Sequence, residues 1–178
     1  EELIKDLPNQ NHEFLNGQYP YTINPGGPNH EELASLIGIY EYFINLYNHH
    51  YKNKEISILN KIKKINNLIS LHEQEIANPI LKYIYDRKDF RLIGKNQING
   101  KDRAPTISFI SIEKTSKEIS KKLLLNKIAT RNDNFYAWRC LKYLGIDIND
   151  GVIRLSMTHY NSNLDSERAI DALEKIWA

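Results

Sequence analysis

The sequence is poor in cysteine and methionine. Its 178 residues include one cysteine, Cys140, and one methionine, Met157. A single cysteine excludes an internal disulfide and a zinc site built from several cysteines, and such usage is typical of a reducing compartment, so we expect a cytoplasmic location. Because the chain opens with Glu1 rather than methionine, we expect it to be a piece of a longer protein, cut either naturally or for expression.

Long apolar runs and an excess of one charge are also missing. No apolar stretch approaches the about 18 residues that a membrane span needs, and no basic-then-apolar leader opens the chain. The 24 basic residues nearly balance the 22 acidic ones. Composition therefore excludes a strongly basic nucleic-acid binder, and we expect neither nucleic acid nor a membrane as a partner. Hydrophobic residues make up 41% of the chain, enough to bury a core.

The first half of the sequence is predicted to be mainly helical. Residues 1–28 are rich in proline and glycine and should be irregular. Asn29 is a candidate N-cap for an apolar helix over 29–48. Isoleucines three or four residues apart then predict an amphipathic helix over 56–87, which Pro79 should kink. This helix could form a coiled coil, but packing on its own domain is favoured.

The second half alternates between strand and helix patterns. A capping box of Thr115 and Glu118 and a cap formed by Ser162 with Asp165 each predict the start of a helix. Beyond a boundary near residue 88 we expect an α/β class domain with a βαβ-type sheet of three or four strands and helices on one face. The predicted strands are 90–94, 105–111, 128–130 and 152–157, and the remaining predicted helices begin near 115, 135 and 162 and end near 124, 144 and 177.

A few residues could support chemistry. Arg154 stands in an apolar strand, either at a sheet edge or directed at a carboxylate or phosphate. Gly26 and Gly27 precede a helix and form either a simple turn or a backbone site for an anion. Cys140 is expected to be a buried, inert thiol. The six histidines show no metal-binding spacing, so no metal site is predicted, and His72 is interpreted as a core residue.

Several segments resemble one known family. They are similar to the C-terminal small domain of class V aminotransferase-like enzymes of fold type I, above all those of the cysteine-desulfurase-like group. The resemblance spans roughly residues 20–177 and implies a remnant of the large domain and a connecting kinked helix over 1–88, followed by the small domain over 89–178. The similar segments are 24–31, 115–118, 129–131, 134–137 and, most specifically, Val-Ile-Arg-Leu-Ser-Met-Thr-His-Tyr-Asn at 152–161.

The resemblance implies a cofactor and partners. The intact enzyme would use pyridoxal 5′-phosphate, which this piece alone should not bind tightly, and would act on an amino acid. Arg154 matches the arginine that pairs with the substrate α-carboxylate, and Gly26 and Gly27 match a pair whose backbone contacts the cofactor phosphate across a dimer interface. Gly27 stands where the family usually has a hydroxyl residue. The expected partners are the missing N-terminal large domain and a second copy in a homodimer.

Two departures from the family limit the predicted chemistry. Tyr136 occupies the position of the sulfur-accepting cysteine, and Cys140 follows one helical turn later, so desulfuration by the usual route is not expected, whereas other elimination, racemisation and transamination stay open. The Schiff-base lysine lies upstream in the family, so no catalytic residue is assigned here and the 178 residues alone are predicted to be inactive. The alternative is a non-catalytic α+β protein-interaction module derived from the same scaffold.

Overall fold

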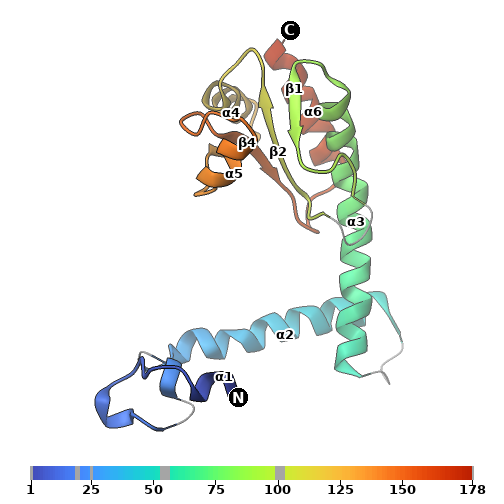
Figure 1. The fold of residues 1–178 in the computed structure, drawn as a ribbon. Coiled ribbons are helices and arrows are strands. Elements are labelled where there is room, and N and C mark those ends of the chain that lie inside the picture. Colours follow the sequence, from blue (N-terminus) through green and yellow to red (C-terminus); the bar gives the residue numbers. More distant parts are fainter. Residues whose placement is uncertain (1, 19–20, 25, 53–56, 99–102, 178) are drawn as a thin grey trace. The chain divides into compact units, whose positions relative to one another are not determined.

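A computed structural model describes residues 2–18, 21–24, 26–52, 57–98 and 103–177. The chain divides into two compact units, 1–62 and 63–178, and each is treated by itself. The domain boundary expected near residue 88 concerns the intact enzyme and stays a prediction. The elements in Figure 1 are α1 (Glu2–Lys5), η1 (Glu13–Leu15), η2 (Tyr21–Ile23), α2 (His30–His50), α3 (Ile58–Asp86), β1 (Phe90–Ile93), β2 (Thr106–Ser111), α4 (Ser116–Leu125), β3 (Arg131–Asp133), α5 (Trp138–Tyr143), β4 (Val152–Ser156) and α6 (Asn163–Trp177).

The first unit is dominated by α2, and the predicted helix is confirmed. The Asn29 side chain caps it by accepting a hydrogen bond of 3.0 Å from the backbone N–H of Glu32. Only Tyr47 is buried on this helix. Phe43, Ile44 and Leu46 are half-buried. The exposed large apolar side chains of the helix are Leu33, Leu36, Ile37, Ile39, Tyr40 and Tyr42. No helix among the described ranges is long and apolar enough to cross a membrane.

The second unit is built on a four-stranded sheet with the strand order β1-β2-β4-β3. All neighbouring strands are antiparallel. Because β4 lies between β2 and β3, those two strands run parallel to each other with α4 as their crossover, which makes a split βαβ unit. The predicted α/β class is therefore confirmed, and the βαβ connection is present with a strand inserted between its two parallel strands.

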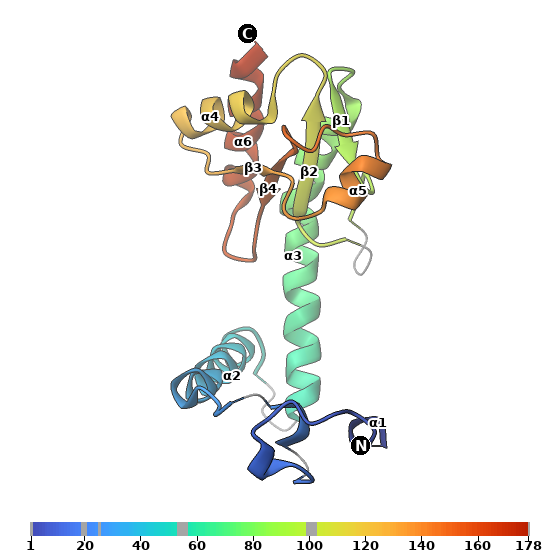
Figure 2. The same cartoon turned by 60° about the vertical axis from the view of Figure 1, so that its left-hand side comes forward.

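Helices cover both faces of the sheet, which differs from the prediction of a single covered face. The main core joins the C-terminal half of α3, α4 and α6 to the side chains of Ile107, Phe109, Ile153 and Leu155. On the opposite face α5 and the following loop form a smaller cluster around Leu141, Ile146 and Val152. Figure 2 shows α4 and α6 on one side of the sheet and α5 on the other. The sequence of the short helix α5 does not indicate which face of the sheet the helix covers.

Two element boundaries were predicted wrongly. Residues 128–130 are not a strand, because the Ile128 N–H bonds back to the Leu123 carbonyl and Lys127 takes a positive φ of 62°, a geometry that closes the end of α4. The strand β3 follows it instead. The helix predicted from residue 135 begins at Trp138, since Phe135 and Tyr136 also have positive φ. The predicted capping box at Thr115 is confirmed.

Candidate functional site

Arg154 lies in the middle of β4, an inner strand flanked by β2 and β3. The alternative that placed it at a sheet edge is therefore wrong. Its neighbours Ile153 and Leu155 are buried in the main core. Because successive side chains on a strand point to opposite faces, Arg154 projects to the face that carries α5. An apolar strand thus delivers one half-buried guanidinium to a defined face of the sheet.

Arg154 lines an open hollow of about 230 Å³ together with Ala129, Thr130, Arg131 and Ser156. Arg131 is its register partner on β3, so both arginine side chains lie on the same face. Like charges directly opposite each other on neighbouring strands are unfavourable. No carboxylate is among the residues that line the hollow. Two cations and two hydroxyl residues make this surface suited to an anion.

The Arg154 guanidinium has an aromatic neighbour and forms no ion pair with a carboxylate of the described residues. Its Cζ atom lies 4.2 Å from the centroid of the Phe135 ring, and the Arg131 Cζ lies 5.8 Å from the same centroid. The Nε atom of Arg154 is buried and has no hydrogen-bond partner within the described part of the chain. A buried donor left without a partner costs about 1–3 kcal/mol. A ligand oxygen that reached this atom would remove that cost.

The loop that carries Phe135 is held by Asn134. The Asn134 Oδ1 atom accepts a hydrogen bond of 3.1 Å from the Tyr136 N–H, and its amide donates at 3.2 Å to the Ile148 carbonyl. Phe135 and Tyr136 have φ values of 50° and 60°. Tyr136, which the resemblance is expected to place at the position of the sulfur-accepting cysteine, is fully exposed.

Cys140 is exposed on α5. The prediction that its thiol is buried was wrong. The six-residue α5 buries Leu141 alone, so the other side chains of the helix, including that of Cys140, face away from the small cluster.

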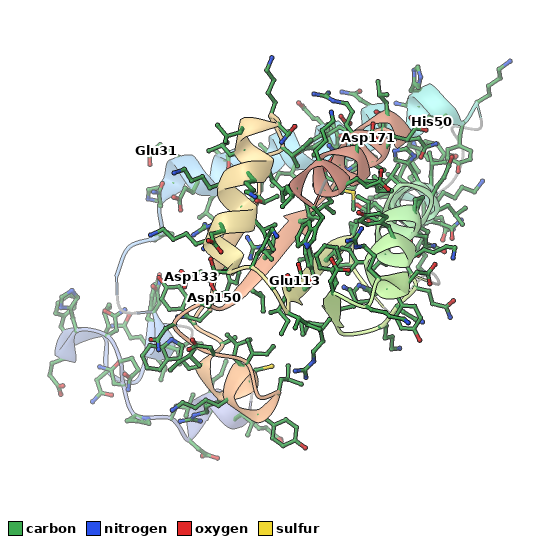
Figure 3. The ribbon with its side chains drawn as sticks, turned by 90° about the horizontal axis from the view of Figure 1, so that it is seen from above. Glu31, His50, Glu113, Asp133, Asp150 and Asp171 are labelled. Carbon is green, nitrogen blue, oxygen red and sulfur yellow. The ribbon has the colours of Figure 1, made fainter. Side chains whose placement is uncertain are left out.

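The segment before β4 is fixed against the start of α4. The Asp150 carboxylate accepts hydrogen bonds of 2.9 and 3.0 Å from the Ser116 N–H. Gly151 has a φ of 70°, and a Cβ built on it would lie 2.2 Å from the backbone carbon of Asp133. Asp133 and Asp150 are labelled side by side near the start of α4 in Figure 3. This close approach brings β3, and with it Arg131, against β4.

Gly26 and Gly27 lie in the first unit, and the structure describes them separately from Arg154. Both are exposed, and a Cβ on either would meet nothing within 4 Å. The Gly26 N–H donates a hydrogen bond of 3.5 Å to Asn24 Oδ1, and no contact with the described residues requires glycine at either position. Glu31 and Glu32 stand in the first turn of α2, where their charges oppose a bound anion. The contact expected between these two glycines and a phosphate therefore stays a prediction.

Other candidate groups have structural roles or none. The His72 Nε2 atom lies 2.8 Å from the Asn161 carbonyl oxygen, so the histidine has a hydrogen-bond partner. It is half-buried rather than the core residue that the sequence predicts. The described residues hold no group of three side chains suited to a metal ion. Sequence reasoning missed both Phe135 and Arg131. Arg131 lies at the site because β3 pairs with β4, and Phe135 because its backbone has a positive φ. Neither feature can be predicted from an arginine or a phenylalanine in the sequence.

Comparisons with known proteins find relatives of this chain in sequence and in fold. No family model matches the sequence. A curated relative, an aminotransferase-like protein of Gibberella zeae, is 26% identical over 110 residues, which are 61% of this chain and 27% of the relative. The cysteine desulfurase CsdA of Escherichia coli matches with a TM-score of 0.62 and 18% identity, over 89% of this chain and 33% of that one. A cysteine desulfurase of Thermococcus onnurineus matches with a TM-score of 0.54 and 21% identity, over 67% and 29%.

The predicted resemblance is confirmed in the fold. The described residues have the fold of part of a class V aminotransferase-like enzyme. Within that class, the solved structures that share it include cysteine desulfurases and a NifS-like protein of Rickettsia africae with a TM-score of 0.51, 18% identity and coverage of 67% of this chain and 32% of that one. The chain spans about a quarter of the curated relative and about a third of these solved chains.

Proposed function

We propose that this chain is part of a pyridoxal-phosphate-dependent enzyme that acts on an amino acid and is cysteine desulfurase-like, selenocysteine lyase-like or aminotransferase-like. Within it, Arg154 binds the α-carboxylate of the substrate. The observation that carries the proposal is a guanidinium on an inner strand, with a buried Nε donor that lacks a partner, in a hollow without a carboxylate. When bound, the cofactor would supply an electron sink for the substrate Cα.

The residues of this chain have separate proposed roles in binding the substrate and the cofactor. Arg154 would fix one end of the substrate through a planar, paired donor geometry that matches a carboxylate. The backbone at Gly26 and Gly27 would contact the cofactor phosphate, and the residues that hold the cofactor ring would come from the remainder of the intact protein, as in the family. Because Tyr136 replaces the sulfur-accepting cysteine, the proposed chemistry is elimination, racemisation or transamination rather than persulfide formation on this loop.

The test is Arg154→Ala in the full-length protein, assayed with a panel of amino acids. We expect kcat/KM to fall by a factor on the order of 100, because a charged hydrogen-bonded pair is lost. Arg154→Lys should recover only part of this loss, since lysine cannot donate a planar pair of hydrogen bonds. Arg168→Ala on α6 is the matched control, because it removes an exposed arginine outside the hollow. The Nη1 atom of Arg168 lies 4.0 Å from Asp165 Oδ1. An unchanged kcat/KM in the Arg154 variant would refute the carboxylate role.

A further inference from the structure

No carboxylate of the described residues orients the Arg154 side chain. A carboxylate can hold a guanidinium in a paired hydrogen-bonded geometry. No carboxylate of the described residues forms an ion pair with Arg154, and its Nε atom donates to none of their acceptors. The orientation of this guanidinium must therefore come from another contact.

Phe135 provides that contact. The Arg154 Cζ lies 4.2 Å from the centre of its ring, well inside the distance of about 6 Å at which a cation is attracted to an aromatic face. The ring is itself held in place, because Phe135 packs against the small cluster of Leu141, Ile146 and Val152. The guanidinium therefore lies against an apolar support that belongs to the folded core.

A neutral support suits a site for an anion better than an acidic one. A carboxylate beside Arg154 would cancel its charge and occupy its N–H donors. A ring in contact with the guanidinium leaves the positive charge in place, and a guanidinium on a ring face keeps its in-plane donors for a ligand. Arg131 lies against the same ring at 5.8 Å, so both cations of the hollow share this support.

The backbone places the ring by an uncommon conformation. Phe135 and the next residue, Tyr136, both adopt positive φ values that residues with side chains rarely take. Asn134 stabilises the turn through its hydrogen bonds to the Tyr136 N–H and the Ile148 carbonyl. A helical start at residue 135, as the sequence pattern predicts, would not give this backbone geometry. The strain at these two residues is therefore coupled to the position of the ring.

We propose that Phe135 is a positioning residue, whose ring holds the Arg154 guanidinium ready for the substrate carboxylate without neutralising it. The proposal rests on the function proposed for Arg154 and extends it to a residue that contacts the arginine rather than the substrate. It also assigns a role to the paired positive φ values of the loop between β3 and α5.

The direct test is the mobility of the Arg154 side chain in the 178-residue chain, measured by nitrogen relaxation of its Nε–H group. Phe135→Leu keeps an apolar side chain of similar size but removes the ring, and we expect a clear fall in the order parameter of this group. Phe135→Tyr should preserve it. Tyr143→Leu, an aromatic-to-leucine change at a largely exposed position of α5, is the control. An equally ordered Arg154 in the Phe135→Leu variant would overturn the proposal.

Kinetics of the full-length protein separate the two proposals. Phe135→Leu should raise KM for an amino acid by about 3- to 30-fold, the range of a cation–ring contact, with a smaller effect on kcat. Phe135→Tyr should stay within about twofold of the parent, because its ring retains the same face. If Arg154→Ala raises KM and Phe135→Leu does not, the positioning role fails and the carboxylate site survives. If neither variant changes KM, the function proposed for Arg154 fails.

Discussion

At the scale of single residues, the candidate site was predictable where chemistry and local pattern coincide. An arginine between the apolar residues Ile153 and Leu155 indicates a cation that faces a carboxylate or phosphate rather than the core. The structure places this arginine on an inner strand. Phe135 and Arg131 could not be recognised, because an aromatic side chain and an arginine are common in sequences without any site. Phe135 matters because its ring lies close to the Arg154 guanidinium, and Arg131 because it pairs with Arg154 across two strands. Both contacts join segments about 20 residues apart in the sequence.

Replacing Gly151 should disturb the site through the backbone, because this glycine lets β4 approach β3 closely. Gly151→Ala would force a side chain into the Asp133 backbone and strain a positive φ, which should lower the free energy of unfolding by about 2–5 kcal/mol. Gly145→Ala is the control, since Gly145 has a φ of 67° but open space around it, and it should cost only about 1–2 kcal/mol. Urea unfolding of the two variants measures the difference. Equal losses would show that the close approach to β3 is not important for stability.

At the scale of elements, the caps were predicted well and the short elements were not. Asn29 and Thr115 cap α2 and α4 as their sequence spacing indicates, because capping depends on residues only three positions apart. The strand β3 and the helix α5 have three and six residues, too few for a periodic pattern to establish their limits. The loop between them is fixed by side-chain hydrogen bonds that no periodicity encodes.

The turn from α3 into β1 is held by a salt bridge between Arg87 and Asp89. Its two N–O distances are 2.8 and 2.6 Å, and Arg87 also contacts the rings of Tyr83, Phe90 and Trp177. The hydrogen bonds from Arg87 lower the pKa of Asp89 below its ordinary value of 3.8. A lowered folded-state pKa means that the carboxylate stabilises the fold above its ordinary pKa and loses this effect as the pH falls through the folded value.

Asp89→Asn should therefore be less stable than the parent chain at pH 7, by about 1–3 kcal/mol. The difference should shrink below about pH 4 and vanish once the carboxyl is protonated in both states. Thermal unfolding across this pH range measures it. Asp86→Asn is the control, because Asp86 pairs with Lys82 at an exposed position and should change stability by less than about 1 kcal/mol at any pH. A difference for Asp89 that does not depend on pH would contradict the assignment.

At the scale of the whole molecule, the notable feature of α2 is the apolar face that it leaves exposed. Leu36 and Ile37 are 55% and 62% exposed, on a helix that buries only Tyr47. Contiguous exposed apolar surface favours association. The helix was predictable from the sequence, but its exposure was not. An apolar stripe indicates that a helix face is buried, but it does not indicate which surface covers that face.

We expect the 178-residue chain to self-associate through this face. Leu36→Lys combined with Tyr40→Lys should shift the chain toward the monomer, because two charges then interrupt the apolar stripe. Glu41→Lys, which changes charge at an exposed position of the same helix, should have little effect. Sedimentation velocity over a range of concentrations measures the distribution. A parent chain that stays monomeric, or a double variant that associates equally, would contradict this expectation.

The role proposed for Arg154 is to bind a substrate carboxylate, and the most direct measurement compares an amino acid with its carboxamide as substrates of the full-length protein. The parent enzyme should prefer the acid, and Arg154→Ala should reduce that preference in kcat/KM by about 10- to 100-fold, since only the charged group loses a partner. The carboxamide itself should react almost equally with both enzymes. If the Arg154 variant kept the full preference for the acid, another residue would bind the carboxylate and the function proposed for this site would be wrong.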